Sequence, residues 1–259
     1  MSQLDRGDVA IHYEVYGNGP ALLLSNGYSA TTRMWTPNIE ALSERFTLIL
    51  WDMRGHGQSS SPKEDSAYSE ALTTQDMAAL LDHLGFASAV IGGLSLGGYM
   101  SLAFNLDYPE RVDALLIIDT GPGFKNDSAR AEWNKTAIAR AEDLENKGAA
   151  ALDDSIREST PSGSVDRMGL ARAARHMLTQ SSPRVIESLP KITCPSLVLV
   201  GADDTPFLAA AEYMANKIPN AEKLVIPDAG HLSNMDQPRR FNDGILAFLD
   251  AASGLEDAP

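Results

Sequence analysis

The sequence predicts an α/β protein built on one mostly parallel central sheet flanked by helices. Short apolar runs rich in β-branched residues recur along the chain, and amphipathic helical segments separate them. Strands that alternate with helices form βαβ units, in which the strands run parallel. At 259 residues, 44% of them hydrophobic, the chain is long enough for one α/β core and an insertion.

Seven runs have the character of strands. Residues 9–16 alternate between apolar and polar side chains, which predicts a strand exposed at the sheet edge. The other six runs are almost continuously apolar, as strands covered on both faces are. They span residues 21–25, 46–52, 89–94, 114–119, 196–201 and 223–226.

Two helices stand out between these strands. Residues 72–84 repeat apolar side chains at helical spacing, and Gly85 follows where a left-handed C-terminal cap is expected. Residues after Ser95 repeat the same spacing as far as Leu106, and Pro109 ends that helix.

Residues 124–190 interrupt the alternation of strands and helices. They are rich in Ala, Arg and Glu and contain no strand-like run. Two apolar helical faces are predicted there, the first with Trp133, Ala137, Ala141 and Leu144, the second with Leu170, Ala173, Ala174, Met177 and Leu178. We therefore divide the chain into an α/β core, residues 1–123 and 191–259, and a helical cap insertion, residues 124–190. Long insertions at the carboxyl ends of parallel strands frame ligand crevices, although a surface excursion without function is the alternative.

Composition excludes several classes of protein. The net charge of −14 disfavours nucleic acid and anionic membranes as partners. Cys194 is the sole cysteine, so an intramolecular disulfide and a cysteine-based zinc site are excluded. The first residues lack the pattern of a signal peptide, and no apolar run approaches the length of a membrane span. We expect a cytoplasmic enzyme or binding protein.

Ser95 lies in the pattern G-x-S-x-G, between a predicted strand and a predicted helix. Such a serine adopts a strained backbone conformation in a tight turn, so Gly93 and Gly97 leave room that side chains would fill. The turn lifts the hydroxyl clear of the sheet, and the N–H groups of the following helix point toward it. A tight structural corner would need similar glycines, so the role of Ser95 depends on its partners.

A serine nucleophile needs a base that a third group holds in place. Of five histidines, only His56 and His231 follow predicted strands and can reach the carboxyl edge of the sheet. His231 comes after the last strand and completes the chain order Ser, Asp, His. The turn that contains His56 is better explained as structural.

Three carboxylates compete for the third role. Asp203 and Asp204 follow the strand at residues 196–201, and Asp119 ends the strand before it. A carboxylate at residue 203 or 204 would lie one loop away from His231, where it could fix the imidazole tautomer. Spacing alone does not separate the adjacent pair.

Five ordered segments, residues 23–28, 52–59, 93–97, 200–204 and 229–231, make the chain resemble the α/β-hydrolase fold family over nearly its whole length. The resemblance implies an α/β-hydrolase fold with a helical cap. It also implies that the acid lies three residues after Gly201, which selects Asp204. An oxyanion hole formed by the backbone N–H groups of Tyr28 and Leu96 is implied as well. The expected mechanism needs no cofactor and no metal, and the sequence contains neither H-E-x-x-H nor G-x-x-x-x-G-K.

The early loop departs from the common family pattern. Many members carry His-Gly there, whereas this chain has Asn26-Gly27. This version resembles carboxylesterases and the 3-oxoadipate enol-lactonases and related lactone hydrolases, and Trp133 resembles a cap tryptophan of that group. Asn26 and Trp133 are therefore candidates for substrate binding, although Asn26 could instead hydrogen-bond its own loop.

The predicted function is a serine hydrolase that cleaves a small-molecule ester or lactone through an acyl-enzyme, with Ser95, His231 and Asp204 as its catalytic triad. Alternatives with the same triad are a C–C bond hydrolase and a perhydrolase or cofactor-free haloperoxidase relative. A non-catalytic ligand-binding module is the alternative from another class. The natural substrate and the stereoselectivity are left open. The oligomeric state is open as well, and a homo-oligomer is compatible with the sequence.

Overall fold

The computed structural model describes residues 2–148 and 166–254. Within them one eight-stranded sheet has the order β1-β2-β4-β3-β5-β6-β7-β8. The strands are β1 (Ser2–Asp5), β2 (Ala10–Tyr16), β3 (Ala21–Ser25), β4 (Thr47–Trp51), β5 (Ala89–Leu94), β6 (Val112–Ile118), β7 (Ser196–Gly201) and β8 (Ala221–Ile226). β1 and β2 run antiparallel to their neighbours, and all pairs from β4 to β8 are parallel. The predicted mostly parallel sheet is confirmed.

One expectation for the sheet is wrong. Residues 9–16 were expected at its edge, but β2 lies between β1 and β4. β1 covers the outer side of β2 and contains one buried residue, Leu4, in four. A strand so short and so exposed carries no apolar pattern that would have revealed it.

The helices between the strands begin and end close to the predicted limits. Gly85 caps α2 in the left-handed conformation with φ 81°, and α3 ends just before Pro109. The α-helices are α1 (Ile39–Ser43), α2 (Glu70–Leu84), α3 (Leu96–Asp107), α4 (Asp127–Lys147), α6 (Arg167–Ala173), α7 (Arg184–Ser188), α8 (Thr205–Lys217), α9 (Ser233–Asp236) and α10 (Pro238–Gly254). Short 3₁₀ segments span Thr32–Asn38, Asp65–Ala67, Pro109–Arg111 and Leu189–Lys191, and a π-helical turn, Ala174–Leu178, continues α6.

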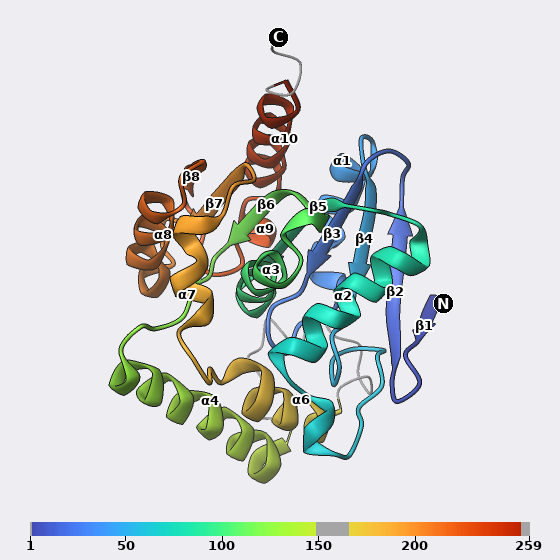
Figure 1. Ribbon diagram of the computed structural model, residues 1–259, viewed down its shortest axis with the longest axis vertical. Helices are drawn as coiled ribbons and strands as arrows, with labels where there is room; N and C mark the ends of the chain where they lie inside the picture. The colour runs from blue at the N-terminus through green and yellow to red at the C-terminus, as the bar shows by residue number, and fades with distance from the viewer. Residues whose placement is uncertain (1, 149–165, 255–259) are drawn as a thin grey trace.

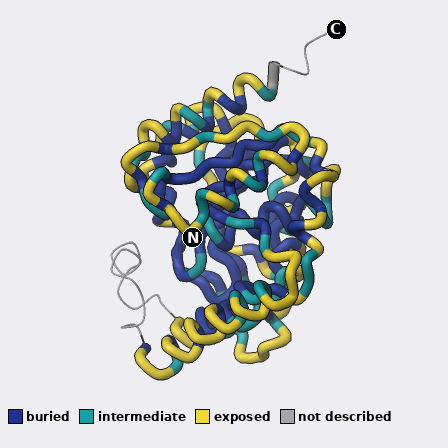
Figure 2. Tube along the Cα trace, turned by 90° about the vertical axis from the view of Figure 1, so that its left-hand side faces the viewer, coloured by how far each residue is buried: buried dark blue, intermediate teal, exposed yellow. Residues whose placement is uncertain are grey.

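Helices cover both faces of the sheet (Figure 1). Apolar side chains of α2, α3, α7 and α8 pack on one face, and those of α1 and α10 pack on the other. Successive residues of a strand point to opposite faces, so Leu23 belongs to the first cluster, and Leu22 and Leu24 belong to the second. The strands form a buried layer inside a shell whose outer turns are exposed (Figure 2). This arrangement explains why strands with apolar residues at every position are stable here.

The described part of the 124–190 segment lies across one end of the sheet as α4, α6 and the π-helical turn (Figure 1). Both predicted apolar faces are present, since Ala137, Ala141 and Leu144 of α4 and Leu170 of α6 are buried. Residues 149–165 of the predicted insertion lie outside the described residues. α7, inside the predicted boundary at 190, contacts α3 on the sheet.

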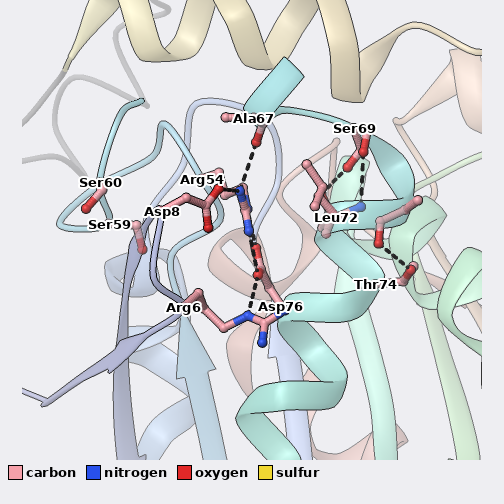
Figure 3. A network of polar contacts seen from close by, with 12 residues as sticks. Arg6, Asp8, Arg54, Ser59, Ser60, Ala67, Ser69, Leu72, Thr74 and Asp76 are labelled. Carbon is pink, nitrogen blue, oxygen red and sulfur yellow. Dashed lines mark hydrogen bonds and ion pairs between the residues drawn. The ribbon is translucent and has the colours of Figure 1, made fainter. Parts of the chain in front are cut away.

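The turn after β4 is fastened by a buried arginine (Figure 3). The guanidinium of Arg54 donates two hydrogen bonds to Asp76 of α2, at 2.6 and 3.0 Å, and one to Asp8 at 2.8 Å. Arg54 also donates to the carbonyl of Ala67, and Arg6 adds a second cation to Asp76. A buried charge needs partners of this kind, so the network fixes the 54–57 turn against α2. This agrees with a structural role for the turn.

None of the helices in residues 2–148 and 166–254 combines the length and the apolarity that a membrane crossing requires.

Candidate active site

Ser95 stands at the corner between β5 and α3 with a strained backbone. Its φ of 57° and ψ of −116° lie outside the conformations that non-glycine residues prefer. The neighbouring strand holds it there, because Ser95 donates its N–H to Ile118 O at 2.9 Å and its carbonyl accepts from Thr120 Oγ1 at 2.7 Å. The strain is thus maintained by hydrogen bonds with Ile118 at the end of β6 and with Thr120, two residues beyond it.

Two glycines make this corner sterically feasible. A Cβ on Gly93 would lie 2.4 Å from the carbonyl carbon of Gly97, and a Cβ on Gly97 would lie 2.2 Å from Ser25 O. Neither contact can be relieved by turning a side chain, because the opposing atoms are backbone. The glycines that the motif predicts are therefore required by close packing of the turn on itself and on β3.

His231 and Asp204 meet at the same edge of the sheet. The imidazole Nδ1 lies 2.8 Å from Asp204 Oδ2. A carboxylate oxygen can only accept a hydrogen bond, so Nδ1 carries the proton and Nε2 is left as an acceptor. Gly201 lets the two loops approach, since a Cβ there would lie 2.3 Å from Gly230 O. Phe207 stacks on the imidazole, with ring centroids 5.0 Å apart.

The geometry separates the three candidate carboxylates. Asp203 is exposed, and its backbone N–H bonds to Ala229 O. Asp119 is buried and accepts hydrogen bonds from the Gly201 N–H and from Ser233, two residues after His231. Asp204 alone of the three is hydrogen-bonded to the imidazole in the described part of the chain.

Asp119 instead ties the loops that carry Asp204 and His231 to the end of β6. Burial raises the pKa of its carboxyl to about 7, although the hydrogen bonds from Ser233 and Gly201 lower it. The nearby charge of Asp204 raises it further. A buried carboxylate beside a second one is therefore harder to ionise than an ordinary aspartate.

Two backbone N–H groups lie beside the serine. Leu96 begins α3, so its N–H has no acceptor within the helix. The 26–28 loop runs past Ser95, because a Cβ on Gly27 would lie 3.6 Å from the Cβ of Ser95. Within the described residues, neither Leu96 nor Tyr28 donates its N–H to another group. Both amides are free to bind a ligand oxygen.

The nucleophile and base candidates are not yet hydrogen-bonded to each other. In the described residues, no hydrogen bond joins Ser95 Oγ to His231. Hydrogen bonds of this kind are often long in ligand-free enzymes and tighten when substrate binds.

A cavity of about 230 Å³ opens beside Ser95. Its walls come from Ser95 and the start of α3, from the loop after β6, and from the start of α8. The remaining wall comes from α4 and from the end of the π-helical turn with the segment that follows it. Apolar groups dominate, among them Trp133, Phe124, Leu178 and Phe207. The lining combines a serine with an apolar chamber of small-molecule size.

The two candidates for substrate binding differ in position. Trp133 lines the cavity, and its Nε1 donates to Leu178 O at 2.8 Å. Asn26 is fully buried, donates to Trp51 O and Asp52, and accepts from Trp35. Its amide is already used by partners outside its own loop, and Asn26 does not line the cavity. Asn26 therefore anchors the loop to β4 and to Trp35 and is not placed against a ligand in this cavity.

His56 is not placed to act as the base. Its Nδ1 lies 3.0 Å from Arg54 O, and the ring packs edge-on against Tyr28. Burial lowers the pKa of His56 to about 4. Sequence reasoning missed Phe207, Thr120 and Gln180, which all line the cavity. For Thr120 a signal was available, because it follows β6 at the edge where the other site residues gather.

Comparison with known proteins identifies the family of the fold. A model of the alpha/beta hydrolase fold family matches residues 20–152. The chain belongs to the alpha/beta hydrolase fold family. The predicted fold class is thereby confirmed, and the resemblance to esterases and lactonases is confirmed by the relatives.

Three relatives of this hydrolase span almost its whole length. The 3-oxoadipate enol-lactonase 2 of Acinetobacter baylyi is 29% identical, with 93% of this chain and 94% of the relative aligned. The enol-lactonase structure from Burkholderia xenovorans has a TM-score of 0.83 at 26% identity and covers 96% of this chain and 100% of its own. A thermophilic esterase from Thermogutta terrifontis has a TM-score of 0.85 at 30% identity. Its structure covers 97% of this chain and 99% of its own. In the described residues of this hydrolase, no group of three or more His, Cys, Asp or Glu side chains is arranged to hold a metal ion.

Proposed function

We propose that this hydrolase cleaves a small-molecule carboxylic ester or lactone through a covalent acyl-enzyme on Ser95. One observation carries the proposal. His231 Nδ1 is hydrogen-bonded to Asp204 Oδ2 at the edge of the sheet where the strained Ser95 lies. Supporting it are the free amides of Leu96 and Tyr28 and the relatives, which include an enol-lactonase and an esterase.

Acylation begins when Ser95 Oγ attacks the acyl carbonyl carbon and its proton passes to His231 Nε2. The carbonyl oxygen becomes an oxyanion, which accepts hydrogen bonds from the amides of Leu96 and Tyr28. Removing one such donor typically costs about 10²–10³ in rate. Asp204 keeps the imidazole oriented and stabilises its protonated form.

The tetrahedral intermediate then collapses. The bond to the alkoxy oxygen breaks, and the leaving alkoxide takes the proton from His231. Water next attacks the acyl carbon and gives a proton to His231, and the second intermediate expels Ser95 Oγ, which recovers that proton. The products are a carboxylic acid and an alcohol, which remain joined as one hydroxy acid when the substrate is a lactone.

Steady-state kinetics with short and long acyl esters, simple lactones and enol-lactones test the proposal. Ser95→Ala and His231→Ala are expected to lower kcat by about 10³-fold or more, because the residues of such a triad act as a unit. Ser43→Ala, which removes a hydroxyl bonded to Glu40 O on the exposed surface, is the matched control. A serine-directed phosphonate should label Ser95 in the wild type. Unchanged ester hydrolysis in Ser95→Ala would overturn the mechanism.

C–C bond hydrolases and perhydrolases use the same triad, so the same panel includes a vinylogous β-diketone and a peroxide-dependent halogenation assay. Cleavage of the diketone with a higher kcat/KM than any ester or lactone would replace the proposed substrate class.

A further inference from the structure

Gln180 is a polar side chain in the cavity wall that the proposed mechanism does not use. It lines the cavity that opens on Ser95 and is 8% exposed. Its Oε1 is buried and has no hydrogen-bond partner among the described residues. A buried polar atom of this kind is unfavourable unless a ligand completes it, so it points to a role in binding.

The other polar side chains of the wall, apart from Ser95, are already engaged. Tyr99 donates its hydroxyl to Glu70, Thr120 donates to Ser95 O, and Trp133 donates to Leu178 O. The hydroxyls of Tyr99 and Thr120 keep lone pairs but have no further proton to donate. Within the described lining, this leaves the amide of Gln180 as the side chain that can both donate and accept a new hydrogen bond without breaking an existing one.

Two features hold Gln180 in this position. Asn134 of α4 clamps its backbone, because Asn134 Oδ1 accepts the Gln180 N–H at 2.8 Å and Asn134 Nδ2 donates to Gln180 O at 2.9 Å. Gly123, with φ 89°, makes room for the amide, since a Cβ there would lie 2.7 Å from Gln180 Oε1. A side chain at residue 123 would displace the amide, so the wall is shaped around it.

Charge limits what the amide can receive. Among the described lining residues there is no Lys, Arg, His, Asp or Glu. A carboxylate bound in this apolar chamber would lose its water without gaining a countercharge, which is costly. A neutral group would be desolvated at lower cost and could pair with the amide.

We propose that Gln180 is a specificity-determining residue that recognises one uncharged hydrogen-bonding group, such as a hydroxyl, on an otherwise apolar acyl chain. This inference rests on the proposed function, since it assumes that the acyl group attached to Ser95 occupies the cavity. It selects hydroxyl-bearing acyl esters over carboxylate-bearing ones.

The test compares three ethyl ester series, each made at several chain lengths. One series ends in a hydroxyl, one in a methyl group at the same position and one in a carboxylate, as in ethyl 6-hydroxyhexanoate, ethyl heptanoate and monoethyl adipate. At the best-fitting length the wild type should show about tenfold higher kcat/KM for the hydroxyl ester than for the methyl ester, the ratio expected of one hydrogen bond. The carboxylate ester should be the poorest substrate.

Gln180→Met keeps the length of the side chain and removes the amide. It is expected to lower kcat/KM about tenfold for the hydroxyl ester and to change the methyl ester less than twofold. Gln75→Met, at an exposed position of α2, is the matched control and should leave both values unchanged. Equal losses on both esters, or no hydroxyl preference in the wild type at any length, would overturn the inference.

The same variants separate this inference from the proposed function. If hydrolysis depends on Ser95 but the preference for the hydroxyl ester does not depend on Gln180, the inference is wrong and the proposed function stands. If no ester were hydrolysed, the proposed function would fail. Calorimetric binding of 1,6-hexanediol and 1-heptanol would then test whether Gln180 binds a hydroxyl group. Tighter binding of the diol by the wild type, lost in Gln180→Met, would support it, and equal binding by both proteins would reject it.

Discussion

The ring of Phe207 lies nearly parallel to the imidazole of His231, with an angle of 21° between their planes. The same turn that carries Asp204 places this ring, because Phe207 donates its N–H to Asp204 O at 2.9 Å. Phe207 also lines the cavity. One short segment thus presents the carboxylate to the edge of the imidazole and an aromatic surface to its face.

Replacing Phe207 with Leu should lower kcat for ester hydrolysis by about three- to tenfold. Aromatic pairs of this kind contribute about 0.5–1.5 kcal/mol beyond the area they bury, and the unstacked imidazole gains orientations that do not face Ser95. Phe124→Leu, on another part of the cavity wall, should change KM and leave kcat within twofold. An unchanged kcat in Phe207→Leu would show that Asp204 alone orients the imidazole.

Asp204→Asn should reduce kcat by about 10³- to 10⁴-fold, because the amide can present an N–H to Nδ1 and stabilise the wrong tautomer. Asp203→Asn is the control at the adjacent position, where the side chain is exposed. It should retain most of the activity. Steady-state kinetics on one ester with both variants decide the assignment, and the reverse ranking would move the acid by one residue.

Asp119 should make the stability of this hydrolase depend on pH. Its carboxyl ionises near 3.8 in the unfolded chain, and burial raises its pKa to about 7 in the folded state. Between these values the folded state binds more protons, so stability is fully present below about pH 4 and is lost as the pH rises through 7. Asp119→Asn removes this contribution.

Urea unfolding of both proteins at pH 4.5, 6 and 7.5 measures this effect. The free energy of unfolding of the wild type, relative to Asp119→Asn, is expected to fall as the pH rises. Comparison with the variant cancels the titration of other groups. A difference between the two proteins that stays constant over this range would mean that Asp119 is ionised throughout.

Arg54→Met should destabilise the fold by about 3 kcal/mol, because it leaves the buried carboxylate of Asp76 with Arg6 as its remaining cation. Arg45→Met removes an exposed partner of Asp250 and serves as the surface control. Urea midpoints should shift markedly for Arg54→Met and stay within error for Arg45→Met. Equal midpoints in the two variants would show that the network in Figure 3 contributes little to stability.

The sheet was largely predictable because its central strands are buried on both faces. β3, β5 and β7 begin and end where their apolar runs do. β1 escaped detection because its pairing with β2 depends on the backbone and leaves three of its four side chains exposed. The apolar faces of α4 and α6 were visible as helical spacing, whereas their position across the end of the sheet depends on tertiary packing.

The candidate site divides in a similar way. Ser95, Asp204 and His231 lie in short motifs whose chain order sequence reasoning can follow, and the structure brings the last two into hydrogen-bonding contact. Gln180 and Phe207 carry no local signal, because a cavity wall is assembled from segments far apart in the chain. Asn26 was suggested as a substrate contact because nothing local reveals that distant Trp51 and Asp52 occupy its amide.

Tyr28 connects α6 to the proposed oxyanion site. Its hydroxyl donates to Leu170 O of α6 at 2.9 Å, and its backbone N–H is one of the two proposed oxyanion donors. The position of the Tyr28 amide therefore depends on the position of α6, because one residue spans the distance between them. A substitution that displaces α6 would reach the proposed oxyanion site without touching the loop that carries it.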